Sequence, residues 1–238
     1  MNKICSVIVG GSKGNGLEIS KILKIRKDYI INISRSKSKY ANKNISIDLL
    51  NTKYLETLKK NFKNVKIQNL IFSQRYRGNN PDEEINLMIK SSYEIINLFK
   101  DKFKNNGSVV FLSSTAINNI ADQNEIYNLS QSARESLVKY FAVKFRKNSV
   151  RFNCVLPSRL IKSENKLFFQ KNTKIKNLLK KINPINRIPT SKDTAMLVEF
   201  LTSNNSKMIN GTSIIVDGGL HLRGQEDLIN EFFNKKIT

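Results

Sequence analysis

The sequence predicts an α/β fold in which a doubly wound parallel sheet lies between two layers of helices. Short apolar runs alternate along the chain with longer segments whose apolar residues recur at helical spacing. Parallel strands need a crossover connection, usually a helix, so this alternation indicates a parallel sheet covered on both faces. The first apolar run, residues 4–9, leads into a glycine-rich turn at 10–16. Apolar residues at 19, 22 and 23 then suit one face of a helix.

The other elements follow in chain order, bounded by polar or turn-forming residues. Strands are expected over 29–33, 45–49, 70–74, 108–112, 150–156 and 213–216. Helices are expected over 54–62, about 82–103, 126–147 and 193–202. Asn106 and Gly107 predict a turn before the fifth of the strands, and Pro157 ends the sixth. No linker, repeat or low-complexity segment divides the chain, so residues 1–238 are expected to form a single domain.

The composition limits the classes of partner and compartment. The formal net charge is +22, but the lysines are spread along the chain and no nucleic-acid-binding motif accompanies them, so nucleic acid is not expected as a partner. No apolar run reaches membrane-spanning length, and the N-terminal run is too short for a signal peptide. Cys5 and Cys154 are expected to be core residues of a cytoplasmic protein rather than a disulfide or metal pair. No metal site is predicted.

The turn after the first strand has the composition of a phosphate-binding loop. Gly10, Gly14 and Gly16 remove side chains where the backbone turns tightly between a strand and a helix. They would let a pyrophosphate approach the free N–H groups at the start of the helix, as in a Rossmann-type dinucleotide site. A glycine-rich turn without a ligand would have the same composition, so both interpretations stay open on the turn alone.

The end of the second strand indicates which dinucleotide would bind. An acidic residue there would bind the hydroxyls of the adenosine ribose. The strand runs instead into Ser34 and Arg35, and Lys13 projects from the glycine turn. Two cations with nearby hydroxyls suit the 2′-phosphate of NADP(H). The alternative is a solvated basic loop in a basic protein.

A set of short motifs occurs in one order along nearly the whole chain. They are the glycine turn at 9–16, with Val9 in place of a usual Thr; Asp48 and Leu49; Asn86; Ser114; the Tyr-x-x-Ser-Gln run at 127–131; Arg151–Pro157; and the Asp-Gly-Gly run at 217–219. Their order resembles that of the short-chain dehydrogenase/reductase family. The separation of 13 positions between Ser114 and Tyr127 is also the usual one in that family.

The resemblance implies a role for each matched position. The catalytic set is Asn86, Ser114, Tyr127 and Gln131. The cofactor-binding positions are Gly10, Ser12, Lys13, Gly14, Asn15, Gly16, Ser34, Arg35, Asp48, Leu49, Ser73 and Gln131. Within these sets, Asn86 would support a proton-relay water, and Asp48 and Leu49 would contact the adenine.

The implied activity is hydride transfer from NADPH to a carbonyl compound, a ketone or aldehyde that can be part of a sugar or acyl conjugate. The cofactor supplies the hydride. Tyr127 would donate the proton, and Ser114 would give the carbonyl oxygen a second hydrogen bond. The family also implies a homodimer or homotetramer that pairs through the helices expected at 82–103 and 126–147.

Two departures from the family's pattern bear on activity. The loop after the fourth strand is Phe-Ser-Gln-Arg at 72–75 instead of Asn-Asn-Ala-Gly, and the active-site Lys is replaced by Gln131. A free tyrosine titrates near pH ~10, and a nearby ammonium group stabilises the phenolate and would also hold the nicotinamide ribose. Gln131 can hydrogen-bond the ribose hydroxyls but carries no charge.

Two hypotheses follow from the missing lysine. In the first, Arg75 supplies the cation from the loop that faces the cofactor. Arg134 is less suited to this role, because a position three residues beyond Gln131 need not face the site. In the second hypothesis, the chain is a catalytically degenerate member of the family that binds a dinucleotide or a protein partner without turnover.

Two further features are weighed against simpler interpretations. The basic, aromatic segment at 158–190 would form a substrate lid by the resemblance. Such a lid suits an anionic substrate, although an amphipathic surface in a basic protein is the preferred interpretation. His221 is the only histidine and is expected to be structural, because Tyr127 already fills the acid role.

Overall fold

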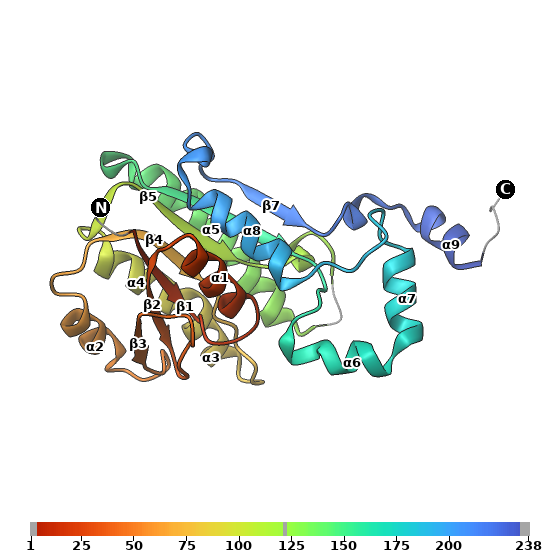
Figure 1. Ribbon diagram of the computed structural model, residues 1–238, viewed down its shortest axis with the longest axis horizontal. Coiled ribbons are helices and arrows are strands. Elements are labelled where there is room, and N and C mark those ends of the chain that lie inside the picture. The colour runs from red at the N-terminus through yellow and green to blue at the C-terminus, as the bar shows by residue number, and fades with distance from the viewer. Residues whose placement is uncertain (1–3, 121–122, 234–238) are drawn as a thin grey trace.

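The computed structural model describes residues 4–120 and 123–233, and within them the chain forms a seven-stranded sheet in the order β3-β2-β1-β4-β5-β6-β7 (Figure 1). Neighbouring strands run parallel throughout. The strands are β1 (Cys5–Val9), β2 (Tyr29–Ser34), β3 (Lys43–Ser46), β4 (Ile67–Phe72), β5 (Phe103–Leu112), β6 (Arg151–Pro157) and β7 (Ser213–Val216). The predicted doubly wound parallel sheet is confirmed.

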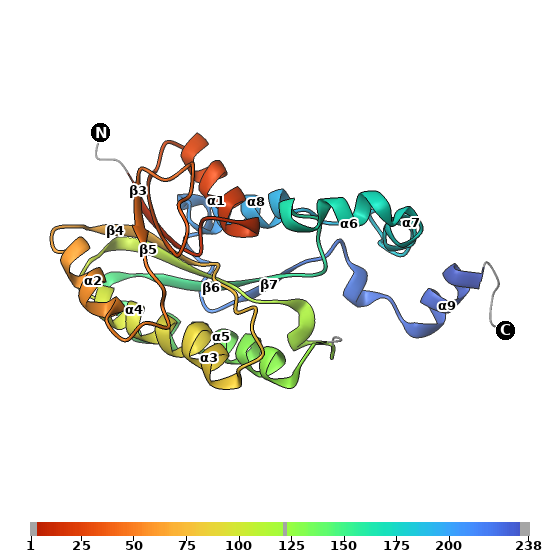
Figure 2. The same ribbon diagram turned by 90° about the horizontal axis from the view of Figure 1, so that it is seen from below.

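Helices cover both faces of this sheet. The α-helices are α1 (Gly14–Ile25), α2 (Tyr54–Asn61), α3 (Pro81–Ile85), α4 (Ser91–Phe99), α5 (Glu125–Lys144), α6 (Lys166–Lys171), α7 (Thr173–Lys181), α8 (Ser191–Leu201) and α9 (Gln225–Phe233). The π-helical turn η1 (Asn86–Lys90) joins α3 to α4, and short 3-10 turns are η2 (Thr115–Ile117), η3 (Arg146–Asn148), η4 (Ser163–Asn165), η5 (Asn204–Ser206) and η6 (Leu220–Leu222). Figure 2 shows α1 and α8 on one face, and α2, α3, α4 and α5 on the other.

The two faces of the sheet bury separate apolar clusters. Successive strand residues point to opposite faces, so Ile8 of β1 packs with Ile19 of α1 and Val198 of α8. On the other face, Phe111 of β5 packs in a cluster with Val138 of α5. All five residues of β1 are buried, which explains why apolar residues of this strand point to both faces of the sheet instead of alternating with exposed polar residues.

The direction of winding reverses beside β1. The chain proceeds from β1 to β2 and β3 on one side, then returns to place β4, β5, β6 and β7 in sequence on the other. In an open parallel sheet such a reversal leaves a crevice at the carboxyl ends of the flanking strands, here β1 and β4. The fold therefore places the glycine turn after β1 beside the loop after β4.

The structure corrects the boundaries of the third predicted helix. It was expected over 82–103 as one helix, but α4 ends at Phe99 and Phe103 already belongs to β5. The pairing of β4 with β5 shifts register between Ile67 and Asn69, which lie opposite Phe103 and Ser108, so β5 bulges there. The turn predicted at Asn106 and Gly107 is this bulge, and Asn106 adopts a φ of 60°.

The segment predicted as a lid forms η4, α6 and α7. Figure 1 shows α6 and α7 beyond the carboxyl ends of the strands, and α9 at the end of an extended connection after β7. No helix among the described residues combines the length and the apolar character that crossing a membrane requires.

Cys5 and Cys154 are free, buried thiols, which confirms their assignment to the core. Burial raises the pKa of Cys5 to about 11 and that of Cys154 to about 12. Both sulfurs therefore stay protonated and unreactive at neutral pH.

Replacing Asp193 with Asn is expected to lower the free energy of unfolding by about 1 kcal/mol at neutral pH. Arg187 donates two hydrogen bonds of 2.8 and 2.7 Å to the Asp193 carboxylate. The backbone N–H and hydroxyl of Thr190 donate two more, of 2.7 and 2.8 Å, at the start of α8. Arg187 is the main reason that the pKa of Asp193 falls from 3.8 to about 2.

Because the folded-state pKa is depressed, this stabilisation is present above about pH 4 and is lost as the pH falls towards about 2. Urea titrations of the wild type and Asp193→Asn at about pH 7 and about pH 3 measure the difference. The difference in free energy of unfolding between the wild type and Asp193→Asn should be smaller at the lower pH. A difference of equal size at both pH values would contradict the stabilising role of the Asp193 carboxylate.

Candidate active site

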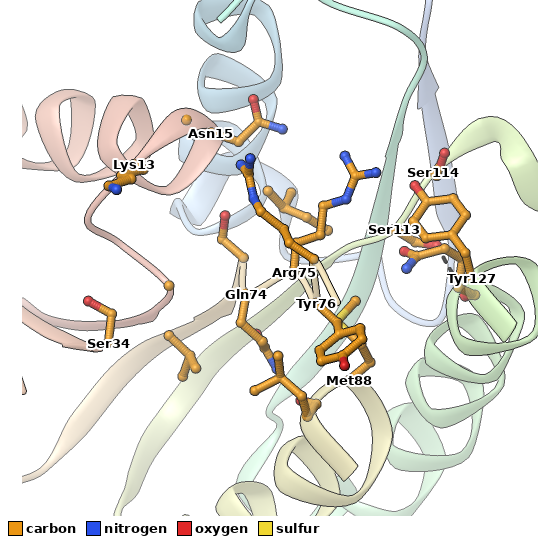
Figure 3. A pocket seen from close by; sticks show the side chains of 18 of the residues that line it. Lys13, Asn15, Ser34, Gln74, Arg75, Tyr76, Met88, Ser113, Ser114 and Tyr127 are labelled. Atoms are coloured by element: carbon orange, nitrogen blue, oxygen red, sulfur yellow. Dashed lines mark hydrogen bonds between the residues drawn. The ribbon is translucent and has the colours of Figure 1, made fainter. Parts of the chain in front are cut away.

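A pocket of about 890 Å³ lies at the carboxyl edge of the sheet, where the winding reverses. Figure 3 shows Lys13, Asn15 and Ser34 on one side, Ser113, Ser114 and Tyr127 on the opposite side, and Gln74, Arg75 and Tyr76 between them. The lining comes from the ends of β1, β2, β4, β5 and β6 and from the first turns of α5. The fold thus brings together segments that are more than 100 residues apart in sequence.

The glycine turn packs tightly against the loop after β4. Gly10 has a φ of 83°, and a Cβ there would lie 2.6 Å from the backbone nitrogen of Gln74. A Cβ at Gly16 would lie 2.1 Å from the backbone oxygen of Gly10. Both positions therefore require glycine, one for the close approach of the loop and one for the start of α1.

Two buried polar atoms at this turn have no partner among the described residues. They are Oδ1 of Asn15, in the first turn of α1, and Oε1 of Gln74. The other end of the Gln74 amide donates 2.9 Å to Ser92 Oγ, which fixes the side chain. Buried polar atoms normally have a partner, so these two oxygens point to a ligand or water in the pocket.

The residues predicted to bind the adenosine end line one side of the pocket. Ser34, Arg35, Asp48 and Leu49 all belong to the lining, together with Lys13 of the turn. The Arg35 guanidinium lies 4.0 Å from the Asp48 carboxylate, and 73% of the Arg35 side chain is exposed. This weak, solvated contact leaves Arg35 available to a stronger anion.

Ser114 and Tyr127 lie on the opposite side, close to the lid. Ser114 follows β5, and its Oγ accepts a hydrogen bond of 3.2 Å from the Ala116 N–H, which leaves the hydroxyl proton free to be donated. Asn124 caps α5 by accepting from the Tyr127 N–H at 2.8 Å. The Arg75 guanidinium lies 5.2 Å from the centre of the Tyr127 ring, within cation–π range.

Gln131 is buried at the bottom of this side. Its backbone oxygen accepts a hydrogen bond of 3.1 Å from Ser113 Oγ, and its side-chain Nε2 lies 3.4 Å from Ser130 Oγ. Ser130 donates in turn to the buried carboxylate of Glu84 at 2.9 Å. The side chain at the position predicted to replace the family's lysine therefore lines the pocket as an ordered, neutral amide.

Sequence reasoning judged Arg134 less suited than Arg75 to supply a cation, because position i+3 from Gln131 need not face the site. In the structure, Arg134 lines the pocket and is 1% exposed. Its guanidinium donates to the backbone oxygens of Leu112, Met88 and Gln74 at 2.5, 3.3 and 3.4 Å. The spacing of positions 127, 131 and 134 on one helix would have revealed the shared face, because side chains three or four positions apart are neighbours.

Asn86 is not brought to the pocket. It is exposed at the start of η1, whereas Glu84 and Met88 on either side of it are buried and Met88 lines the pocket. Two positions along a helix correspond to a rotation of about 200°, so Asn86 faces away from the site. The predicted support for a relay water has no geometric basis at this side chain.

The segment predicted as a basic lid contributes charged residues to the pocket. Arg159 and Lys162 line the pocket, and Arg77 forms an ion pair of 3.3 Å with Glu164. The Glu164 carboxylate lies against the glycine turn, since a Cβ at Gly14 would be 2.8 Å from its Oε1. Burial, together with the charges of Arg75 and Arg77, lowers the pKa of Lys162, although Glu164 opposes this.

His221 lies outside this pocket. Its Nδ1 is 2.9 Å from the Asp217 carboxylate, which also accepts hydrogen bonds from the backbone N–H groups of His221 and Gly219. The histidine thus closes the turn after β7, as expected for a structural residue.

The comparisons with known proteins agree with this geometry. A family model described as Enoyl-(Acyl carrier protein) reductase matches residues 75–221. A tropinone reductase homologue of Arabidopsis thaliana is 33% identical over 119 residues, 50% of this chain and 44% of that protein. Dehydrogenase/reductase SDR family member 4 of Rattus norvegicus is 33% identical over 113 residues, 48% of this chain and 40% of that protein. The chain thus spans less than half the length of these two relatives.

Solved structures share the fold along almost the whole chain. A short chain dehydrogenase family protein from Francisella tularensis superposes with a TM-score of 0.82 at 24% identity, over 93% of this chain and 100% of that one. ElxO, solved with NADP bound, gives 0.80 at 18% identity over the same shares. Because a family model covers more than half of the sequence and the fold agrees, the chain belongs to the short-chain dehydrogenase/reductase family.

Proposed function

We propose that the protein is an NADPH-dependent reductase that transfers hydride to a ketone or aldehyde. The observation that carries this proposal is the presence, in one pocket, of a glycine-turn cradle and the pair Ser114 and Tyr127. The cradle fits a dinucleotide, since Gly10 and Gly16 leave no room for side chains and Asn15 Oδ1 is buried without a partner. A bound nicotinamide supplies the hydride, and the protein positions it and handles the proton.

The charge on the adenosine side supports NADP(H) over NAD(H). Lys13 and Arg35 line this side with the Ser34 hydroxyl, and Asp48 meets Arg35 only at 4.0 Å. A 2′-phosphate would offer Arg35 shorter, charge-assisted hydrogen bonds than this carboxylate does. ElxO, which has the same fold, was solved with NADP bound.

The chemistry of the reacting side follows from two hydroxyls. The Tyr127 phenol donates its proton to the carbonyl oxygen as that oxygen gains negative charge. Ser114 donates the proton that its contact with the Ala116 N–H leaves free, and so stabilises the same oxygen. Gln131 would hydrogen-bond the nicotinamide ribose from the bottom of the pocket. The substrate class extends to sugar and acyl conjugates, because Arg75 of the loop after β4 and Arg159 and Lys162 of the lid favour an anionic group.

We also propose a cytoplasmic homodimer or homotetramer that pairs through α4 and α5. Large apolar side chains are exposed on these two helices, namely Tyr93, Leu129, Tyr140 and Val143. Phe141 of α5 does not belong to this exposed set, because its ring is buried within the chain against Phe152 at a centroid distance of 5.6 Å.

Arg35→Ala is expected to weaken the binding of NADPH by about tenfold or more while changing the binding of NADH by less than about twofold, because it removes a charged contact to the 2′-phosphate only. Calorimetric titration with each dinucleotide measures both affinities. Lys37→Ala is the matched control, since Lys37 is an exposed cation of the same loop outside the pocket lining. Equal affinities of the wild type for NADPH and NADH would overturn the 2′-phosphate site.

Tyr127→Phe is expected to lower kcat for carbonyl reduction by about a hundredfold or more, because it removes the proton donor. Consumption of NADPH with a panel of ketones and aldehydes measures turnover, and dinucleotide titration checks that binding is retained. Tyr140→Phe, an exposed tyrosine on the same helix, serves as the control. A variant as fast as the wild type would exclude Tyr127 as the acid.

Glu164→Gln is expected to tighten NADPH binding about fivefold, because the Glu164 carboxylate lies where it would repel a diphosphate at the glycine turn. Its removal would also leave Arg77 and Lys162 as counter-charges for the phosphates. Calorimetric titration of Glu164→Gln with NADPH measures the effect, and Glu56→Gln on α2 is the control. Unchanged or weaker binding in Glu164→Gln would show that the carboxylate does not compete.

A further inference from the structure

We propose that Arg134 is a positioning residue that provides the reacting side of the pocket with the positive charge that the family takes from a lysine at position 131. This inference rests on the proposed reductase function. Gln131 then hydrogen-bonds the nicotinamide ribose and Arg134 supplies the positive charge, two roles that one lysine has in the family's pattern. The missing lysine is then a relocation of charge along α5 rather than a loss.

The geometry of α5 places the relocated charge. Tyr127, Gln131 and Arg134 lie at positions i, i+4 and i+7, so they follow one face of the helix, and all three line the pocket. Gln131 and Arg134 are both buried, whereas Ser132 between them is exposed. The three positions thus share one face of α5, and this face lines the pocket.

The contacts of Arg134 fix three segments that line the pocket. Its three hydrogen bonds reach the end of β5 at Leu112, the π-turn η1 at Met88 and the loop after β4 at Gln74. The guanidinium also lies 5.8 Å from the centre of the Phe111 ring. One side chain of α5 therefore ties together the backbone on three sides of the pocket.

No carboxylate of the described residues forms a direct ion pair with this charge, and the buried Glu84 carboxylate, which acts on Arg134 at longer range, accepts a hydrogen bond from Ser130. No ion pair formed within residues 4–120 and 123–233 includes Arg134. A buried cation without a carboxylate partner is costly, and replacing it by an apolar side chain is often neutral or stabilising. The presence of such a cation in the pocket lining therefore favours a role for its charge.

The charge persists at neutral pH. Burial lowers the pKa of Arg134 to about 10, and Cys154, Tyr127 and Glu84 act in the opposite direction. A positive charge near a phenolate stabilises that phenolate. The phenolate is the form left after the tyrosine gives its proton to the substrate oxygen, so the cation lowers the free energy of proton transfer.

The neutral amide at position 131 fits this arrangement. Side chains three positions apart on a helix are neighbours, with Cβ atoms about 5–6 Å apart. A lysine at 131 would therefore bring a second buried cation beside the guanidinium. Gln131 keeps the hydrogen-bonding capacity towards a ribose and avoids this repulsion.

The test moves the charge back to its position in the family. Arg134→Met is expected to lower kcat at neutral pH by about tenfold to a hundredfold, with NADPH affinity within about threefold of the wild type. Gln131→Lys with Arg134→Met restores one cation on the same face and should recover most of that loss. Gln131→Lys alone, with two cations, should be no faster than the wild type.

A pH profile separates an effect of charge from an effect on folding. In alcohol oxidation with NADP⁺, the pH of half-maximal kcat should rise by about one unit in Arg134→Met, because the phenolate is then harder to form. Arg151→Met is the matched control: Arg151 is also buried and donates to the backbone oxygens of Leu201 and Ile209, but it lies outside the pocket lining. It should lower the Tm without moving the profile.

The proposal is overturned if Arg134→Met keeps the wild-type kcat and pH profile, or if the double variant stays as slow as Arg134→Met while both bind NADPH and remain folded. A wild type that binds NADPH but turns over no carbonyl would refute the reductase function separately. In that case the role of Arg134 is tested by a pH titration. The ultraviolet absorbance of tyrosine phenolate is followed against pH in the wild type and in Tyr127→Phe, and the difference between the two curves reports the ionisation of Tyr127. The midpoint of this difference titration should rise in the Arg134→Met background, and an unchanged midpoint would overturn the proposal.

Discussion

The site depends on how closely the glycine turn after β1 approaches the loop after β4. A Cβ at Gly10 would lie 2.6 Å from the backbone of Gln74, so no side chain can stand between the two segments. The reversal of strand order beside β1 brings these segments together, and the sheet, buried on both faces, holds them rigidly. The dinucleotide cradle and the proton-handling residues share one pocket because both are built on this edge.

A second constraint is the burial of the Arg134 guanidinium among backbone oxygens. The same loop that packs on Gly10 provides one of its acceptors, at Gln74, so the floor of the pocket is continuous from the glycine turn to α5. A charge held in this low-dielectric position acts more strongly on nearby ionisable groups than a solvated one. Arg75 lies over the Tyr127 ring, but it is exposed, so solvent screens its charge. This difference in burial is why the inference rests on Arg134.

Much of the fold could be predicted from sequence, because strand and helix periodicities are local and the motif order fixed the topology. The register shift that extends β5 back to Phe103 is a property of strand pairing, and no local signal announces it. Asn86 faces away from the pocket because of the rotation of the helix through α3 and η1, which the sequence motif alone does not indicate. Arg134 was judged less suited to supply the cation because its position was compared with that of Gln131 alone, and not with Tyr127 seven positions earlier on the same helix face. The contact of Glu164 with Gly14 joins segments 150 residues apart, which only the folded chain shows.

The central claim is that this pocket carries hydride from a dinucleotide to a carbonyl carbon. Incubating the purified protein with NADPH deuterated at the reactive carbon and a carbonyl panel, followed by mass spectrometry of the alcohol products, tests that claim directly. Deuterium on the former carbonyl carbon, with the labelled product formed about a hundredfold or more slowly by Tyr127→Phe, is the result that the account predicts. Tight binding of NADPH without transfer to any carbonyl, under conditions in which an active relative labels its product, would contradict it and identify a binding protein of the same fold.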